Sequence, residues 1–242
     1  MNQHTNPSPI DLAGSTAIVT GAIRGFGRGI ADALAAAGAR VVGVARSGAT
    51  VSADAADPAT AGRLIDEYQP RTVVLCAGAA PQMSPLQEQT WESFSQNWNV
   101  DVAQAFHWIR HALQRPLAPG STVVAISSGA AINGSPLSGG YAGAKATVRL
   151  VTGYAALESE RARLGIDFVS VLPALTPATD LGEKAVAAYA ERQGVDVDTF
   201  VQSLRPALTA EQVGKSVLEI ATGQRRDHRA YTLSSAGLSP LG

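Results

Sequence analysis

The chain has 242 residues, 45% of them hydrophobic and 16% charged, and its formal net charge is −1. Because the charge is nearly balanced, neither nucleic acid nor an anionic membrane surface is an expected partner, which leaves small molecules. No apolar run approaches the roughly 20 residues of a membrane-spanning helix, and the first residues lack the features of a secretion signal. The lone Cys76 excludes an internal disulfide and suits a reducing compartment, so we expect a cytoplasmic protein.

Strand and helix signals alternate along the chain. This alternation favours a single α/β domain over residues 14–242, preceded by a flexible tail over residues 1–13.

The first predicted strand, residues 16–20, leads into the glycine-rich segment TGAIRGFG and then into a helix that ends at Gly38. Gly21, Gly25 and Gly27 would let the backbone turn sharply and bring its amides, with the positive end of the helix, towards a pyrophosphate. The spacing differs from GxGxxG, so a glycine turn in an α/β protein without a nucleotide stays an alternative.

The second predicted strand, residues 40–45, is followed by Arg46 where NAD-binding proteins of this architecture carry an acid for the ribose 2′-hydroxyl. A carboxylate would repel a 2′-phosphate, whereas the guanidinium groups of Arg46 and Arg24 match its geometry. We therefore predict NADP(H) rather than NAD(H) as the cofactor. The alternative is that both arginines are ordinary solvated side chains.

The linker after this strand is too short for a full crossover helix, so we expect the second and third strands to be connected without one. Asp54, near the end of a third predicted strand, could face the adenine, although a local turn role is an alternative. The segment RTVVLCAGAAP is predicted as a fourth strand that breaks at Ala77 and Gly78, where a glycine allows close approach of a cofactor.

The segment from Thr90 to Leu113 is predicted to be helical. Its residues at core-like spacing are Phe94, Trp98, Val102, Phe106 and Ile109. His107 and His111 are four apart, as in some metal sites, but the glutamate of HExxH and a third ligand are missing. We predict that they bind no metal and lie on an exposed or interfacial face.

The chemistry is expected around a fifth strand, residues 122–126, and the helix that follows it. Tyr141 and Lys145 are four apart on one helical face, so the ammonium would favour the phenolate form of the tyrosine. Ser128, just beyond the strand, could donate a hydrogen bond to a substrate carbonyl oxygen. This combination suits proton transfer at a carbonyl.

Together these segments resemble one family, the short-chain dehydrogenases/reductases. TGAIRGFG matches the family's TGxxxGxG turn, and CAG matches its NNAG segment. Ser128 stands thirteen residues before Tyr141, and Lys145 four after it, which is the family's spacing. The segment VLPALTPATD, with Pro173, is similar to the family's PG motif after the sixth strand.

The resemblance implies a Rossmann-type doubly wound parallel sheet with helices on both faces, and an NADPH-dependent carbonyl reductase or alcohol dehydrogenase. Tyr141 would be the general acid, Ser128 would polarise the carbonyl, and Lys145 would bind the nicotinamide ribose and lower the pKa of Tyr141. Thr176 or Thr179 would lie beside the carboxamide. The implied cofactor site comprises Gly21, Ile23, Arg24, Gly25, Phe26, Gly27, Arg46, Ser47, Asp54, Ala55, Ala77, Gly78, Tyr141, Lys145, Pro173 and Thr176.

The chain also departs from the family pattern. Alignment through Phe106 puts Asp101 where the family has an asparagine, with Asn97 and Asn99 as alternatives in another register. An ionisable residue there would change the family's proton relay. Ala174 also replaces the glycine of PG.

Residues 180–204 correspond to the family's variable substrate lid, and the helices around Trp98 to Leu113 and Tyr141 to Leu164 are those through which relatives form dimers or tetramers. We expect a homo-oligomer. Two other functions stay open, namely a non-redox isomerase, dehydratase or cyclase of the same fold, and a dinucleotide-sensing binding protein. The intact serine, tyrosine and lysine set argues against a sensor.

Overall fold

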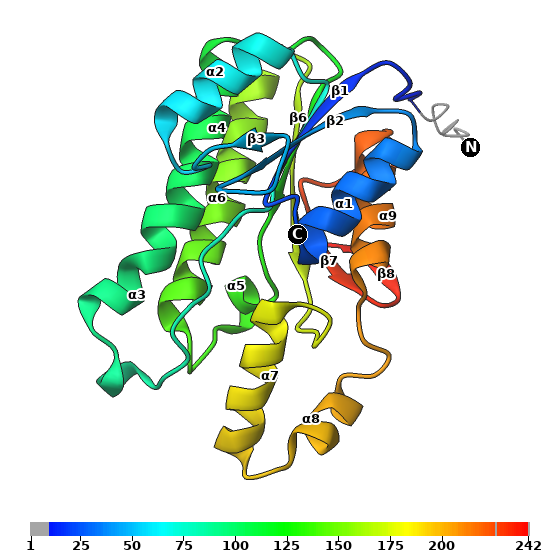
Figure 1. The fold of residues 1–242 in the computed structure, drawn as a ribbon. Coiled ribbons are helices and arrows are strands. Elements are labelled where there is room, and N and C mark those ends of the chain that lie inside the picture. Colours follow the sequence, from blue (N-terminus) through cyan, green and yellow to red (C-terminus); the bar gives the residue numbers. More distant parts are fainter. Residues whose placement is uncertain (1–9, 226, 242) are drawn as a thin grey trace.

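Parallel strands form the centre of the molecule (Figure 1). The computed structural model describes residues 10–225 and 227–241, and within them one sheet has the strand order β3-β2-β1-β4-β5-β6-β7-β8. The strands are β1 (Thr16–Thr20), β2 (Arg40–Ala45), β3 (Val51–Ser52), β4 (Thr72–Leu75), β5 (Thr122–Ile126), β6 (Asp167–Pro173), β7 (Ala230–Ser234) and β8 (Gly237–Pro240). Neighbouring strands are parallel except β7 and β8, which form an antiparallel edge.

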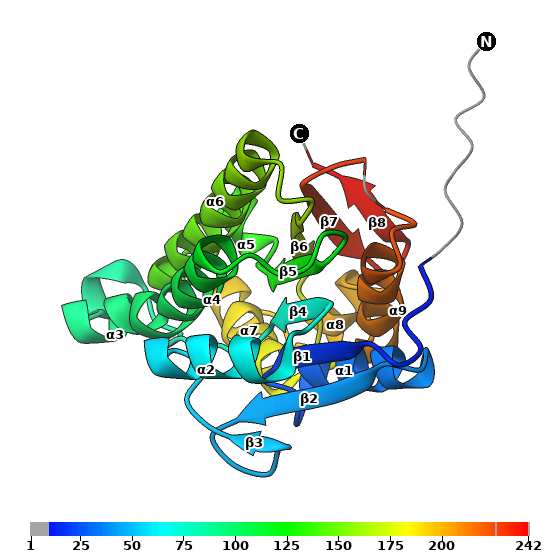
Figure 2. The same ribbon diagram turned by 90° about the horizontal axis from the view of Figure 1, so that it is seen from above.

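Helices cover both faces of this sheet (Figure 2). The helices are α1 (Gly25–Ala36), α2 (Pro58–Tyr68), α3 (Trp91–Asn97), α4 (Ala103–Gln114), α5 (Ala130–Asn133), α6 (Gly139–Ala162), α7 (Asp180–Gln193), α8 (Val197–Ser203) and α9 (Ala210–Ala221). A 3-10 turn, η1, spans Leu86–Glu88, and a π-helical turn, η2, spans Trp98–Val102. Apolar side chains of α2, α4 and α6 form one core, and those of α1 and α9 form the other.

The sheet order places a topological switch point at β1, which pairs with β2 on one side and β4 on the other. In doubly wound sheets, ligands bind outside the carboxyl ends of the strands at such a point. The predicted α/β class and the Rossmann-type sheet are confirmed. The absence of a crossover helix between the second and third strands is also confirmed, because β3 follows β2 directly and pairs with it in parallel.

The helix predicted between Thr90 and Leu113 is interrupted, and its predicted core face was partly wrong. Trp98 is 41% exposed and Phe106 50% exposed, whereas Trp108 is fully buried against the sheet. The buried face instead passes through the polar Asn97 and Asp101 and then Ala105 and Trp108, so the spacing of apolar residues alone did not reveal it.

The chain packs onto the domain earlier than predicted. The tail was expected to run to residue 13, but Leu12 is buried in the core of α1 and α9, and the amide of Ile10 donates to the carbonyl of Thr222. Residues 1–9 lie outside the described residues. No helix in the described part of the chain is long and apolar enough to span a bilayer.

Candidate active site

The glycine turn after β1 is held against the end of β4 by a buried threonine. The hydroxyl of Thr20 accepts hydrogen bonds from the amides of Cys76 (2.9 Å) and Ala77 (3.1 Å) and donates to Gln104 of α4. A Cβ on Gly21 would lie 2.9 Å from the Cα of Ala77, and the φ of Gly21 is +69°. Both the close approach and the left-handed backbone therefore require glycine here.

Helix α1 begins without a side-chain cap. Arg24 occupies its N-cap position and makes no capping hydrogen bond, and the first turn holds no acidic residue. Other helices of the described chain are capped by Asp57, Thr90, Thr179, Asp196 and Thr209. The free amides and positive end of α1 consequently fit an anionic group such as a pyrophosphate.

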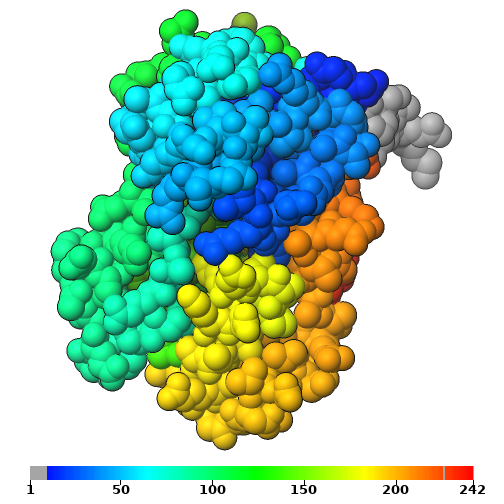
Figure 3. Space-filling view, viewed as in Figure 1, coloured from blue at the N-terminus to red at the C-terminus, as the bar shows by residue number. Residues whose placement is uncertain are grey.

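The α7 end of the predicted lid lies against this turn, and Figure 3 shows the surface of α7 directly beneath the surface of the N-terminal segments. A Cβ on Gly25 would come 3.3 Å from the methyl group of Thr179, and Arg24 forms a 2.8 Å ion pair with Asp180. Thr176 is buried, and its hydroxyl donates to the carbonyl of Leu208 at 2.6 Å. Of the two threonines considered for the carboxamide, Thr179 is the one in contact with the glycine turn.

The predicted adenosine-side residues lie beyond the ends of β2 and β3. Arg46 and Ser47 are exposed there. Asp54 is exposed too, and its carboxylate accepts a 2.9 Å hydrogen bond from the amide of Ala56, so it does have the local turn role considered from the sequence. The carbonyl of the buried Ala55 accepts from the indole of Trp108 at 2.9 Å, which fixes this loop to α4.

The two serines after β5 have different surroundings. The hydroxyl of Ser127 is buried and donates to the backbone carbonyl of Lys145 at 2.7 Å, which ties β5 to α6. The hydroxyl of Ser128 is half-buried and accepts from the amide of Ala130 at 3.2 Å, so its own proton stays available for an acceptor. Ser128 is therefore the serine that can donate to a substrate.

Helix α6 carries the tyrosine and lysine at its start. A Cβ on Gly140 would lie 1.9 Å from the carbonyl oxygen of Phe94, so the close packing of α6 on α3 fixes where this pair stands. The ammonium of Lys145 is 5.7 Å from the ring centroid of the half-buried Tyr141 and donates to the carbonyl of Ile126 at 3.1 Å. The lysine therefore stands beside the phenol ring and is fixed to the end of β5.

Asp101 lies on the other side of this lysine, on the π turn η2. Its Oδ1 is 2.8 Å from the Nζ of Lys145, and both side chains are almost fully buried. Its Oδ2 accepts from the amide of Ala79 (3.0 Å) and from Asn97 (3.2 Å). Although burial disfavours the ammonium, the negative charge of Asp101 raises the pKa of Lys145.

Comparisons with known proteins assign this chain to a family. A short chain dehydrogenase model matches residues 15–190. This chain belongs to the short-chain dehydrogenases. It is 30% identical over 182 residues to an L-xylulose reductase of Bos taurus, a match covering 69% of this chain and 74% of the relative. It is 26% identical over 245 residues to a hydroxynaphthalene reductase of Aspergillus fumigatus, covering 88% of each.

Solved short-chain dehydrogenases share its fold. A crystal structure described as an NAD(P)-dependent gluconate 5-dehydrogenase from Beutenbergia cavernae, with NADP bound at low occupancy, superposes with a TM-score of 0.76. That protein is 25% identical and the match covers 92% of this chain and 95% of the other. A short chain dehydrogenase from Mycobacterium avium superposes with a TM-score of 0.73 at 21% identity, covering 96% and 86%.

The structure also distinguishes the three polar residues considered for the family's asparagine position. Asp101 contacts Lys145, whereas Asn97 donates to the carbonyl of Ala79 and to Asp101, and Asn99 is exposed. The register through Phe106 thus brings Asp101 to the lysine of this short-chain dehydrogenase.

The sequence analysis did not identify Thr20 and Gln104 as residues of the site. Gln104 donates to the carbonyl of Ala77 at 2.8 Å while accepting from Thr20, so it holds the end of β4 at the glycine turn. The sequence shows only a glutamine within a predicted helix. Its burial, which requires hydrogen-bonding partners for the amide, is evident only from the fold.

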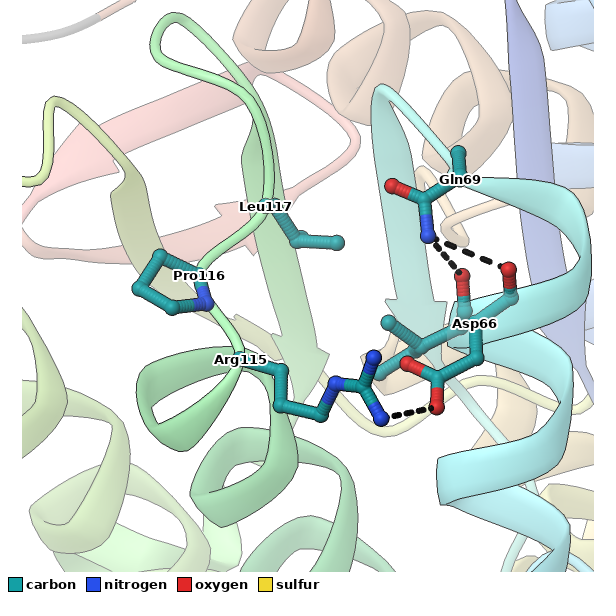
Figure 4. A pocket seen from close by; sticks show the side chains of 6 residues that line it. Asp66, Gln69, Arg115, Pro116 and Leu117 are labelled. Atoms are coloured by element: carbon teal, nitrogen blue, oxygen red, sulfur yellow. Dashed lines mark hydrogen bonds and ion pairs between the residues drawn. The ribbon is translucent and has the colours of Figure 1, made fainter.

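The predicted histidines have partners away from the site. The ring of His111 lies 3.1 Å from Asp66, and His107 packs edge-on against Phe106. Asp66 also lines a pocket between the end of α2 and the loop before β5, where it pairs with Arg115 at 3.0 Å (Figure 4). Gln69 donates to backbone carbonyls of α2 there. This pocket is at the amino ends of β4 and β5, opposite the edge that carries the glycine turn and Ser128.

Proposed function

We propose that this short-chain dehydrogenase is an NADP(H)-dependent oxidoreductase that interconverts a ketone or aldehyde with its alcohol. The observation that carries the proposal is the cation of Lys145, held 5.7 Å from the ring of Tyr141 with Ser128 at the end of the neighbouring strand. All three stand at the carboxyl edge of the sheet, as does the glycine turn. The reductases and the NADP-containing structure among the relatives support the same reaction class.

The residues around the glycine turn fit a dinucleotide. The uncapped end of α1 would bind the pyrophosphate, and Arg46 and Arg24 would bind a 2′-phosphate. Arg24 forms an ion pair with Asp180, and both side chains are about 70% exposed. Such an exposed pair is weak, so Arg24 could leave Asp180 to bind a phosphate. When bound, NADP(H) would donate or accept the hydride.

The proton is handled by the protein. In reduction, the hydroxyl of Ser128 would donate a hydrogen bond to the carbonyl oxygen, and the phenol of Tyr141 would deliver its proton to the same oxygen. In oxidation, the phenolate of Tyr141 would take the proton of the alcohol.

The segment over residues 180–204 would close over the substrate. Its helices α7 and α8 form a small core of their own around Val186, Ala190 and Phe200. Tyr189 hydrogen-bonds to Ser135 at 2.5 Å, which links this segment to the loop before the catalytic helix.

We also propose a homo-oligomer formed through α4 and α6. Large apolar side chains on these helices are about half exposed: Phe106, Leu150, Tyr154 and Leu157. Exposed apolar faces of this kind mark protein interfaces.

The test is Tyr141→Phe, which removes only the hydroxyl. We expect it to abolish turnover of ketones, aldehydes or cyclic alcohols, followed by reduced-nicotinamide absorbance, while NADPH binding followed by fluorescence is largely unchanged. Near-native turnover in this variant would refute the role of Tyr141. Product formation without net NADPH oxidation would point instead to a non-redox reaction at the same site.

A further inference from the structure

The carboxylate of Asp101 is built into the site rather than placed at its rim. Only 1% of the residue is exposed. A Cβ on Gly78 would lie 2.7 Å from Oδ1 of Asp101, so the bare backbone after β4 closes directly over the charge. The amide of Ala79 and the side chain of Asn97 donate to its other oxygen. These contacts hold one oxygen of the carboxylate for Lys145.

Within residues 10–225 and 227–241, the groups facing the lysine include one close counter-ion. Asp101 on η2 is 2.8 Å from its Nζ, and the carbonyl of Ile126 on β5 is 3.1 Å away. Tyr141 on α6 and the thiol of Cys76 after β4 are the other titratable groups that interact with it electrostatically. Burial raises the pKa of Cys76 to about 11, so this thiol is neutral at neutral pH. One carboxylate therefore opposes one ammonium beside the phenol.

The pairing of Lys145 with Asp101 changes the electrostatic potential at the phenol of Tyr141. An ammonium alone would favour the phenolate, whereas an ammonium balanced by a carboxylate at contact distance has a much smaller effect. Because both side chains are buried, water and salt screen the pair weakly.

We propose that Asp101 is a positioning residue that neutralises Lys145 and so keeps the phenol of Tyr141 protonated to higher pH, which sets the pH range in which the tyrosine can deliver or take the proton. The inference rests on the proposed function, in which Tyr141 delivers the proton. An asparagine at this position would leave the charge of Lys145 unbalanced.

The direct test titrates Tyr141 itself and needs no substrate. Tyrosinate absorbance is recorded against pH for the full-length protein and for Tyr141→Phe, and the difference isolates Tyr141. The same pair of curves is then recorded in an Asp101→Asn background. Removal of the negative charge is expected to lower the midpoint of Tyr141 by about one pH unit or more.

The control is Asp66→Asn, which also changes a carboxylate to an amide but lies at the opposite edge of the sheet, beside Arg115. We expect it to leave the Tyr141 midpoint unchanged. An unchanged or raised midpoint in Asp101→Asn would overturn the inference, even if stability or turnover fell, because a purely structural role changes those without moving the titration. If Asp101→Asn does not fold, Asp101→Ser tests the same loss of charge, with a hydroxyl left to accept from Ala79.

A second readout links the titration to catalysis. In a Tyr141-dependent alcohol oxidation, the acidic limb of the kcat/KM profile should move to lower pH in Asp101→Asn by the same amount as the midpoint. Near-native turnover in Tyr141→Phe would mean that the proposed function fails. Loss of turnover in that variant, together with an unmoved midpoint in Asp101→Asn, would mean that only the present inference fails.

Discussion

Lys145→Met should destabilise the protein far more than the loss of an ordinary ion pair. The substitution keeps most of the aliphatic volume but leaves the carboxylate of Asp101 buried without its cation. The pair is 2.8 Å apart, and the two side chains are 8% and 1% exposed. Breaking a buried pair from one side typically costs about 3–5 kcal/mol, a large fraction of the roughly 5–15 kcal/mol that stabilises a domain.

The pH dependence of this contribution follows from the direction of the pKa shift. The folded protein raises the pKa of Lys145 above its ordinary value. The stabilisation is therefore complete below the unfolded-state pKa of about 10.4 and is lost only as the pH rises through the higher folded-state value. At neutral pH the full destabilisation of Lys145→Met should be visible.

The assay is urea unfolding followed by tryptophan fluorescence at neutral pH. The matched control is Lys215→Met, because Lys215 pairs with Glu211 at the same 2.8 Å but is 68% exposed. The control should lose less than about 1 kcal/mol. A loss of less than about 1 kcal/mol in Lys145→Met as well would refute the reasoning, since it would mean that the carboxylate of Asp101 is not left as a buried, unpaired charge.

Three further predictions concern the dinucleotide and the assembly. Arg46→Ala should raise the Kd for NADPH about tenfold or more, which is the loss expected of a charged hydrogen bond. The Kd for NADH, measured by the same fluorescence titration, should be unchanged. An equal change in both Kd values would contradict a role in binding the 2′-phosphate. Gly21→Ala should lower the unfolding free energy and weaken NADPH binding, because its Cβ would meet Ala77 at a positive φ; native affinity and stability would show that the turn tolerates a side chain. Leu157→Lys should convert an oligomer to monomers in light scattering, and a variant with the mass of the wild type would exclude this face.

Much of the fold could be predicted because its signals are local. The ranges predicted for β1, β2 and β5 agree with the structure, since each strand is a short run rich in apolar and β-branched residues. The spacing of Ser128, Tyr141 and Lys145 likewise depends only on a strand end and one helical turn. These features need no knowledge of distant contacts.

The features that were not predicted depend on long-range packing. The π turn η2 could not be predicted from apolar spacing. Nor could the exposure of Trp98 and Phe106, two residues assigned to the core, because the buried face includes the polar Asn97 and Asp101. The partnership of Thr20 with Gln104 joins residues 84 positions apart. The contact of Asp101 with Lys145 similarly required the fold, because the sequence alone left Asn97 and Asn99 as alternatives.

The most direct test of the central claim follows the hydride and the tyrosine together. The protein is incubated with a panel of ketones and aldehydes and with NADPH deuterated at the transferable position of nicotinamide C4, and the alcohols are analysed by mass spectrometry. We expect deuterium on the carbinol carbon with the wild-type protein and no alcohol with Tyr141→Phe. Alcohol that carries no deuterium from either face of the labelled cofactor, or labelled alcohol in equal yield from Tyr141→Phe, would contradict it.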